Sequence, residues 1–321
     1  MLYYLSNYIH LHIVNLIEVI ISIIPGSAVL NCNEYVIDLE RAVYLSKLLG
    51  EVADLIDLLE ENDPQYLAVR TIIRRIGAGL GVVAVLGNAV ISYQLTSRGE
   101  IYWSMFSEWI VEKLPKSIEE LEEVHKEFLL KTRYNVYSLK YKLRRLEKFY
   151  GSTLAKELVI DPFKYCPDIN LLVYKLSRLF QADTSSKTMV FAGKMYYYTC
   201  RLKGKTVGGD IDLPVDRRNS LLTITSCIIK TCAKDIKKCV EDLMKPSCRS
   251  IVINVWKRIS KTSGIPIYRL DSLTWLITGI LKTNNYDPIQ SYEYLCREIG
   301  YCKEKLKELL FALTSCANDK N

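Results

Sequence analysis

The amino-acid sequence predicts an all-α protein, and three observations support that fold class. From Tyr35 onward, apolar residues recur at steps of three and four, which is the period of an α-helix. Alternating apolar and polar stretches that would indicate strands are few, and no internal repeat or low-complexity tract is present. The chain has 321 residues, of which 49% are hydrophobic, so it can bury a large core as one large domain or two modest ones.

Residues 1–33 differ from the rest of the chain. Their apolar run, 2–25, is long enough to cross a bilayer, but it contains Glu18 and several other polar residues, and no Lys or Arg follows it until Arg41. Three interpretations remain open, in this order: upstream sequence included by a misplaced start, an added helix docked on the domain, and a membrane tether. We therefore expect the functional domain to be 34–321, without membrane association.

In the first half of the domain, residues 36–60 have helical periodicity with acids on the opposite face. Pro64 is expected near the first position of the next helix. Residues 66–95 are predicted to be helical, interrupted by three glycines that allow close approach of a neighbour. A turn at 97–99 then precedes an aromatic cluster, and the clustered rings are Tyr102, Trp103, Phe106 and Trp109.

Residues 117–150 form a long, charged region that is predicted to be helical. Its second half interleaves basic residues with tyrosines, which suits either a solvated helix face or a stripe that binds phosphates. Further on, we expect one helix at 219–244, another that carries Trp256 and ends near Gly264, a third containing Asp271 and Trp275, and two short helices in 286–321.

Residues 185–218 are the stretch around which the chain is organised. Lys187, Phe191 and Lys194 lie at i, i+4 and i+7, so one helix face presents an amine, a ring and a second amine. Ser185 and Ser186 are expected to cap this helix, which places Lys187 at its positive end. Positive charge is disfavoured there, so more of the amine should be unprotonated and available as a nucleophile.

Asp216 follows a Leu-Pro-Val step and precedes a new apolar-periodic segment, which is where the N-cap residue of a helix would lie. Taken alone, Lys187 and Asp216 are read more simply as a surface lysine and an ordinary capping aspartate. Their sequence spacing does not show that they meet.

Five segments, however, resemble one known family. SKTMVFAGKM (186–195) and LPVDRR (213–218) resemble the lysine and aspartate segments of the helix-hairpin-helix DNA glycosylases, and in detail those of the archaeal 8-oxoguanine DNA glycosylase/lyases, the AGOG family. DPQYLAV, NAVISYQLTSRGEIYW and SGIPIYRLDSLTWL agree in the same order, and the similarity covers about residues 35 to 280. The glycine-rich hairpin of the wider superfamily is absent, and QADTSSK stands in its place.

This resemblance implies a helix-hairpin-helix DNA glycosylase-like fold, with two helical subdomains and the active site in the cleft between them. It implies that Lys187 and Asp216 are the catalytic pair. The positions that match the family's base pocket are Gln65, Ser92, Trp103, Phe191, Lys194, Asp271 and Trp275. Without the family, the two tryptophans would be read as core residues and Asp271 as a helix cap.

The implied chemistry is excision of 8-oxoguanine: Lys187 attacks C1′, a Schiff base forms, and β-elimination cleaves the strand, with no metal or cofactor. The implied partner is DNA containing 8-oxoguanine, double- or single-stranded. The net charge of +7, which becomes +8 when Glu18 is removed with residues 1–33, suits such a polyanion. We expect a monomer in the cytoplasm of an archaeon, associated with the nucleoid. The alternatives are a non-catalytic helical DNA-binding protein on the same scaffold and a membrane-anchored helical protein.

The ten cysteines raise the question of a metal site. The last three are too few and too widely spaced for a four-cysteine iron–sulfur cluster. Cys227, Cys232, Cys239 and Cys248 form no CxxC pair and have no histidine nearby, so a zinc site is not expected. Buried thiols are the favoured interpretation, and disulfides are the alternative if the source is hyperthermophilic.

Overall fold

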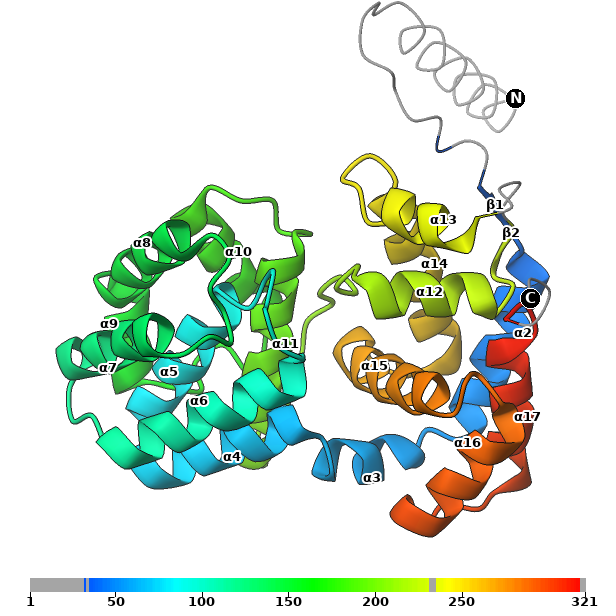
Figure 1. Ribbon diagram of the computed structural model, residues 1–321, viewed down its shortest axis with the longest axis horizontal. Coiled ribbons are helices and arrows are strands. Elements are labelled where there is room, and N and C mark those ends of the chain that lie inside the picture. Colours follow the sequence, from blue (N-terminus) through cyan, green and yellow to red (C-terminus); the bar gives the residue numbers. More distant parts are fainter. Residues whose placement is uncertain (1–31, 33–34, 231–234, 318–321) are drawn as a thin grey trace, which may run out of the picture. The chain divides into compact units, whose positions relative to one another are not determined.

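The computed structural model describes residues 32, 35–230 and 235–317 (Figure 1). The elements are, in order, β1 (Val36–Ile37), α2 (Leu39–Glu51), α3 (Leu55–Glu61), α4 (Pro64–Ile76), α5 (Ala78–Val90), α6 (Gly99–Lys113), α7 (Ile118–Lys131), α8 (Leu139–Tyr150), α9 (Thr153–Ile160), α10 (Ile169–Phe180), α11 (Lys187–Leu202), α12 (Arg217–Thr225), β2 (Ile229–Lys230), α13 (Ile236–Leu243), α14 (Arg249–Ser263), α15 (Ile267–Thr283), α16 (Pro288–Tyr294), the π-helical turn η2 (Leu295–Ile299) and α17 (Glu304–Thr314). The predicted all-α class is confirmed, since β1 and β2 pair only as a two-residue antiparallel ladder.

Within the described residues, no helix is both long and apolar enough to cross a membrane. The apolar run at 2–25 and the proposed boundary at residue 33 lie outside the described ranges. The three interpretations of that segment therefore stay predictions.

Two groups of helices make up the described part of the chain (Figure 1). In the first group, drawn light blue to green, α4, α7, α8, α9 and α11 all contact α5, and α6 packs on α4. In the second group, α2 contacts α14 and α17, while α12 contacts α13 and α15. The groups meet where α11 contacts α15, and α3 touches both α4 and α15.

The centre of the first group is α5, because its sequence is apolar on every side and it is buried from Gly81 to Val90. The predicted interruption of this region occurs only at Gly77, where φ is +81° and the chain passes from α4 to α5. Gly79 and Gly81 lie inside α5. A Cβ at Gly79 would stand 2.5 Å from the carbonyl oxygen of Val159, so the expected close approach does occur there.

Four predicted helical regions were too long. The 66–95 region ends as helix at Val90, the last residue of α5. The 36–60 region begins with β1 and breaks at 52–54, where Asp54 accepts hydrogen bonds from Tyr301 and Lys303 in the second group. The 117–150 region breaks at 132–138, because Asn135 turns inward to donate to the carbonyl of Ile91. The 219–244 region consists of α12, β2 and α13, and Cys227, just after α12, has a φ of +59° that a helix cannot continue.

Most of the described cysteines are in disulfides rather than the expected buried thiols, whereas Cys239 is buried and lies outside these bonds. Cys166 bonds to Cys200, Cys227 to Cys316, and Cys296 to Cys302. The first of these bonds ties the loop before α10 to the last turns of α11, the helix that begins at Lys187. Among the described residues, no cluster of His, Cys, Asp and Glu could hold a metal ion.

Candidate active site

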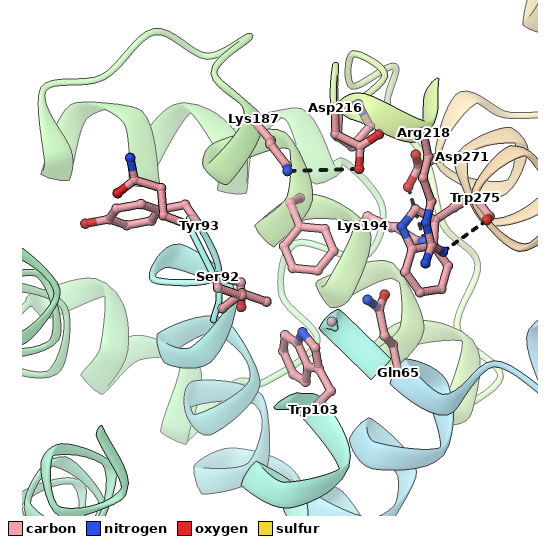
Figure 2. A pocket seen from close by; sticks show the side chains of 15 residues that line it. Gln65, Ser92, Tyr93, Trp103, Lys187, Lys194, Asp216, Arg218, Asp271 and Trp275 are labelled. Atoms are coloured by element: carbon pink, nitrogen blue, oxygen red, sulfur yellow. Dashed lines mark hydrogen bonds and ion pairs between the residues drawn. The ribbon is translucent and has the colours of Figure 1, made fainter. Parts of the chain in front are cut away.

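A cavity of about 220 Å³ opens where α4, α6, α11, α12 and α15 meet (Figure 2). Its lining residues are Gln65, Ser92, Tyr93, Gln94, Leu95, Gly99, Trp103, Lys187, Phe191, Lys194, Pro214, Asp216, Arg218, Asp271 and Trp275. The structure thus brings every residue of the predicted catalytic pair and base pocket to one place. Their chemical roles remain predictions, and the geometry below says what each side chain can do.

Lys187 and Asp216 form a pair at the accessible side of the cavity. Lys187 is the first residue of α11, and its Nζ lies 4.0 Å from Oδ2 of Asp216. The lysine side chain is 44% exposed and the aspartate 17%. Asp216 is the N-cap of α12, as expected: its Oδ1 accepts from the backbone N–H of Asn219 at 2.9 Å. One carboxylate oxygen is therefore fixed by the helix, while the other faces the amine.

The expected serine caps of α11 are only partly present. Ser186 occupies the N-cap position, but its side chain makes no capping hydrogen bond within the described part of the chain. Ser185 binds Asp183 instead. The first-turn N–H groups of α11 are therefore not satisfied by a serine hydroxyl, and the positive end of the helix stays close to Lys187.

Lys194 and Asp271 form a second pair, at the closed side of the cavity. Nζ of Lys194 lies 3.2 Å from Oδ2 of Asp271, and the side chains are only 1% and 4% exposed. Oδ1 of Asp271 accepts from the amide of Asn219, whose own carbonyl oxygen accepts from Thr274. Asn219 therefore binds both pocket aspartates, through its backbone to Asp216 and through its side chain to Asp271.

The carboxylates of Asp271 and Asp63 favour the protonated form of the buried amine of Lys194. Burial by itself would lower the pKa of Lys194, but the carboxylates of Asp271 and Asp63 outweigh it, and the pKa is raised. Burial raises the pKa of Asp63 and of Asp271 as well, against the pull of Lys194. Asp63 is held by hydrogen bonds from Tyr198 and from the backbone N–H of Gln65. We assign the cationic form to Lys194, since it faces more than one carboxylate.

Aromatic rings and one amide form the remaining walls. Trp103 is fully buried and meets Phe191 edge-on, with ring centroids 6.2 Å apart. Trp275 lies on the other side, near Lys194.

Gln65 is 3% exposed, and its Oε1 is buried without a hydrogen-bond partner among the described residues. A buried acceptor on a cavity wall favours a bound group that offers an N–H. The hydroxyl of Ser92 donates a hydrogen bond to the backbone carbonyl of Asn88.

Sequence reasoning assigned no role to Arg218, Asn219 or Asp63. Arg218 is the last residue of the LPVDRR segment, Asn219 directly follows it, and Asp63 opens the DPQYLAV segment, so all three lie within or beside the segments that resemble the family. The capping geometry of Asp216 could have indicated Asn219, because the third residue after an N-cap donates to it. The partner of Arg218, Trp275, lies 57 residues further on, and no local pattern indicates that contact.

A family model and related protein sequences match this chain, and they point to the same family. The family model described as AGOG, N-glycosylase/DNA lyase, matches residues 46–309. An N-glycosylase/DNA lyase of Methanopyrus kandleri is 30% identical over 68% of this chain and 82% of its own length. One from Pyrobaculum aerophilum is 29% identical over 74% of this chain and 85% of its own length.

Among solved structures, the 8-oxoguanine DNA glycosylase of Pyrobaculum aerophilum, complexed with 8-oxoguanosine, superposes with a TM-score of 0.63. The match covers 85% of this chain and 95% of that one at 23% identity, and it confirms the predicted fold class. The family match covers most of the chain, including every residue that lines the cavity. This chain therefore belongs to the AGOG family of N-glycosylase/DNA lyases.

Proposed function

We propose that this protein removes 8-oxoguanine from DNA and then cleaves the strand, with Lys187 as the nucleophile and Lys194 as a contact to the base. The observation that carries the proposal is the presence of two Lys–Asp pairs on one cavity, one accessible and one buried. Family membership supplies the reaction class, and the 8-oxoguanosine bound to the Pyrobaculum aerophilum protein supports the choice of lesion.

In the first step, the free amine of Lys187 attacks C1′ of the flipped nucleotide. The bond from C1′ to the base breaks, and its electron pair leaves with the base, which takes up a proton. Asp216, 4.0 Å from the amine, carries a negative charge beside the sugar and stabilises the positive charge that develops there.

In the second step, the sugar ring opens and Lys187 forms an imine with C1′. The cationic imine acidifies the proton on C2′. Loss of that proton forms a double bond between C2′ and C3′ and expels the 3′ phosphate, which cleaves the strand. Water then releases Lys187. This sequence needs only an amine, a carboxylate and a site from which the base can leave.

The buried side of the cavity reads the base before it leaves. The ammonium group of Lys194 can donate to a carbonyl oxygen, and the carboxylate of Asp271 can accept from a ring N–H. Gln65 adds an unpartnered acceptor. Oxidation gives guanine a new carbonyl at C8 and turns N7 from an acceptor into an N–H donor, so this set of groups favours the oxidised base. Phe191, Trp103 and Trp275 offer faces or edges for packing against the flipped ring.

The expected partner is DNA that carries this lesion, as duplex or single strand, and the expected state is a monomer in the cytoplasm, close to the chromosome. The net charge of +7 supports a polyanionic partner. The alternative, a non-catalytic DNA-binding protein on the same scaffold, shares this charge but has no need of an accessible lysine beside a carboxylate.

Borohydride trapping tests the proposal. Full-length protein is incubated with a duplex containing one 8-oxoguanine, and with the same duplex containing guanine, in the presence of sodium borohydride. We expect a covalent protein–DNA adduct with the lesion duplex only, because borohydride reduces the imine to a stable amine. Binding to both duplexes without an adduct would contradict the proposal and favour the binding-only alternative.

A further inference from the structure

Arg218 joins three of the helices that form the cavity. It belongs to the first turn of α12, two residues after Asp216. Its Nη1 donates to the backbone carbonyl of Trp275 on α15 at 3.3 Å, and its Nη2 pairs with Oε1 of Glu100 on α6 at 2.8 Å. The guanidinium carbon lies 4.0 Å from the centroid of the Trp275 ring, and Figure 2 shows the two side chains against each other at the cavity.

The indole of Trp275 needs such a support, because a space adjoins it outside the base cavity. Trp275 and Arg218 line the base cavity of about 220 Å³, and both also line a second cavity of about 490 Å³. Glu100 and Gly279 lie on the wall of this second cavity. An unsupported indole could therefore turn toward the second cavity and leave the base without a wall to pack against.

Two details show that the surroundings accommodate an arginine at this position. Gly279 lies one turn after Trp275, and a Cβ there would stand 3.4 Å from Nη1 of Arg218, an ordinary van der Waals distance, so the guanidinium lies against this turn of α15 without a clash. The charge is balanced by Glu100, and the planar group can pack on the indole while its nitrogens bind elsewhere. A lysine could keep the charge but not this combination of packing and two directed hydrogen bonds.

We propose that Arg218 is a positioning residue that fixes the indole of Trp275 as a wall of the base cavity. This inference rests on the proposed function, in which Trp275 packs against the flipped base. This role of Arg218 should affect the two steps of the reaction differently. Excision begins with a base in the cavity and therefore depends on Arg218, whereas elimination at an abasic site has no base to hold and does not.

The test compares Arg218→Gln and Arg218→Lys with the wild type under single-turnover conditions. One substrate carries 8-oxoguanine and the other a preformed abasic site in the same duplex. The matched control is Arg217→Gln, which changes the preceding arginine on α12. Arg217 is 64% exposed, pairs with Glu241 and does not line the cavity.

We expect Arg218→Gln to slow excision roughly tenfold, as partial loss of one stacking contact would, and to leave elimination at the abasic site within about twofold. Arg218→Lys should show a smaller loss of the same kind, and it keeps the test available if the glutamine variant does not fold. Arg217→Gln should match the wild type on both substrates.

Equal losses on both substrates would overturn the assignment, because they would show that Arg218 acts on the sugar-phosphate chain or on folding. Unchanged excision in both Arg218 variants would also overturn it. A wild type that cleaves the abasic site but never excises the base would contradict the proposed function itself, and with it this inference.

Discussion

Two Lys–Asp pairs on the same cavity have opposite surroundings. At the accessible side, Lys187 is 44% exposed and stands 4.0 Å from Asp216. At the closed side, Lys194 is 1% exposed and stands 3.2 Å from Asp271. Both lysines come from one helix, α11, two turns apart, and the two aspartates come from α15 and from the N-cap of α12.

The two pairs contain the same residue types and differ in burial, so we base the different roles proposed for them on burial. An amine that attacks a sugar must be able to reach it, and the side chain of Lys187 is exposed enough to do so. An ammonium group that reads a base must keep its proton and its position. Lys194 does so because Asp271 holds it directly and Asp63 adds a second negative charge nearby. In the proposed function, the same two residue types therefore give a nucleophile at one side of the cavity and a fixed hydrogen-bond donor at the other.

The largest expected effect on stability comes from breaking the buried pair. Asp271→Ala leaves the ammonium of Lys194 buried without its closest partner, and we expect the free energy of unfolding to fall by about 3–5 kcal/mol. Asp216→Ala should lower it by only about 1 kcal/mol, which is the usual cost of losing an N-cap. Urea unfolding followed by circular dichroism measures both. Equal losses would show that the two pairs do not differ as described.

The next effect concerns catalysis at the accessible pair. Asp216→Asn keeps a side chain that caps helices as well as aspartate does, but it removes the charge. We expect the single-turnover excision rate to fall about 10²- to 10³-fold, by analogy with removal of other groups that stabilise a transition state, while the unfolding free energy stays nearly constant. The matched control is Asp168→Asn, at the N-cap of α10, which does not line the cavity. A comparable rate loss in that control would contradict the role of Asp216.

The sequence predicted the fold class and the residues of the cavity, but not every break between helices. The helical period predicted the fold class, and the matching segments predicted which residues gather at the cavity, because both depend on patterns that lie along the chain. The same patterns could not place the break in the 219–244 region, where Cys227 adopts a positive φ and bonds to Cys316. A bond between residues 89 positions apart depends on the folded packing, which spacing does not encode.

The candidate site shows the same limit. Lys187 and Asp216 were proposed as a pair because the family carries both, whereas their local sequence indicated only a helix start and a helix cap. Arg218 was overlooked although it stands in the LPVDRR motif, since its contacts to Trp275 and Glu100 are made across the fold. Local patterns therefore placed the helices, and long-range contacts determine which side chains support one another.

A smaller effect is expected from the walls of the cavity. Trp275→Ala should reduce transition-state stabilisation of excision by about 1–3 kcal/mol, the usual contribution of one stacked base. Gln65→Ala should cost about 1 kcal/mol, the usual net value of a hydrogen bond. Binding to undamaged DNA, measured by fluorescence anisotropy, should not change, because these contacts require a flipped base. Equal losses on damaged and undamaged DNA would place both side chains in the structural core instead.

The last expectation concerns pH. The factor by which Lys194→Gln slows excision should not vary with pH. The carboxylates raise the pKa of Lys194 above its ordinary 10.5, so the amine stays protonated from about pH 6 to pH 9. Lys194→Gln should therefore lower the excision rate by the same factor at every pH in that range. Single-turnover rates in overlapping buffers give the two profiles. A change in the shape of the profile would show that Lys194 titrates there, against the assignment of a fixed charge.

The most direct test of the central claim asks which lysine forms the covalent bond. Lys187→Gln and Lys194→Gln are each mixed with a duplex containing 8-oxoguanine and with sodium borohydride, and the adduct is measured by gel electrophoresis. We expect no adduct with Lys187→Gln, and a slower but detectable adduct with Lys194→Gln, because the exposed amine is the nucleophile and the buried one reads the base. An adduct that persists in Lys187→Gln and disappears in Lys194→Gln would contradict the account.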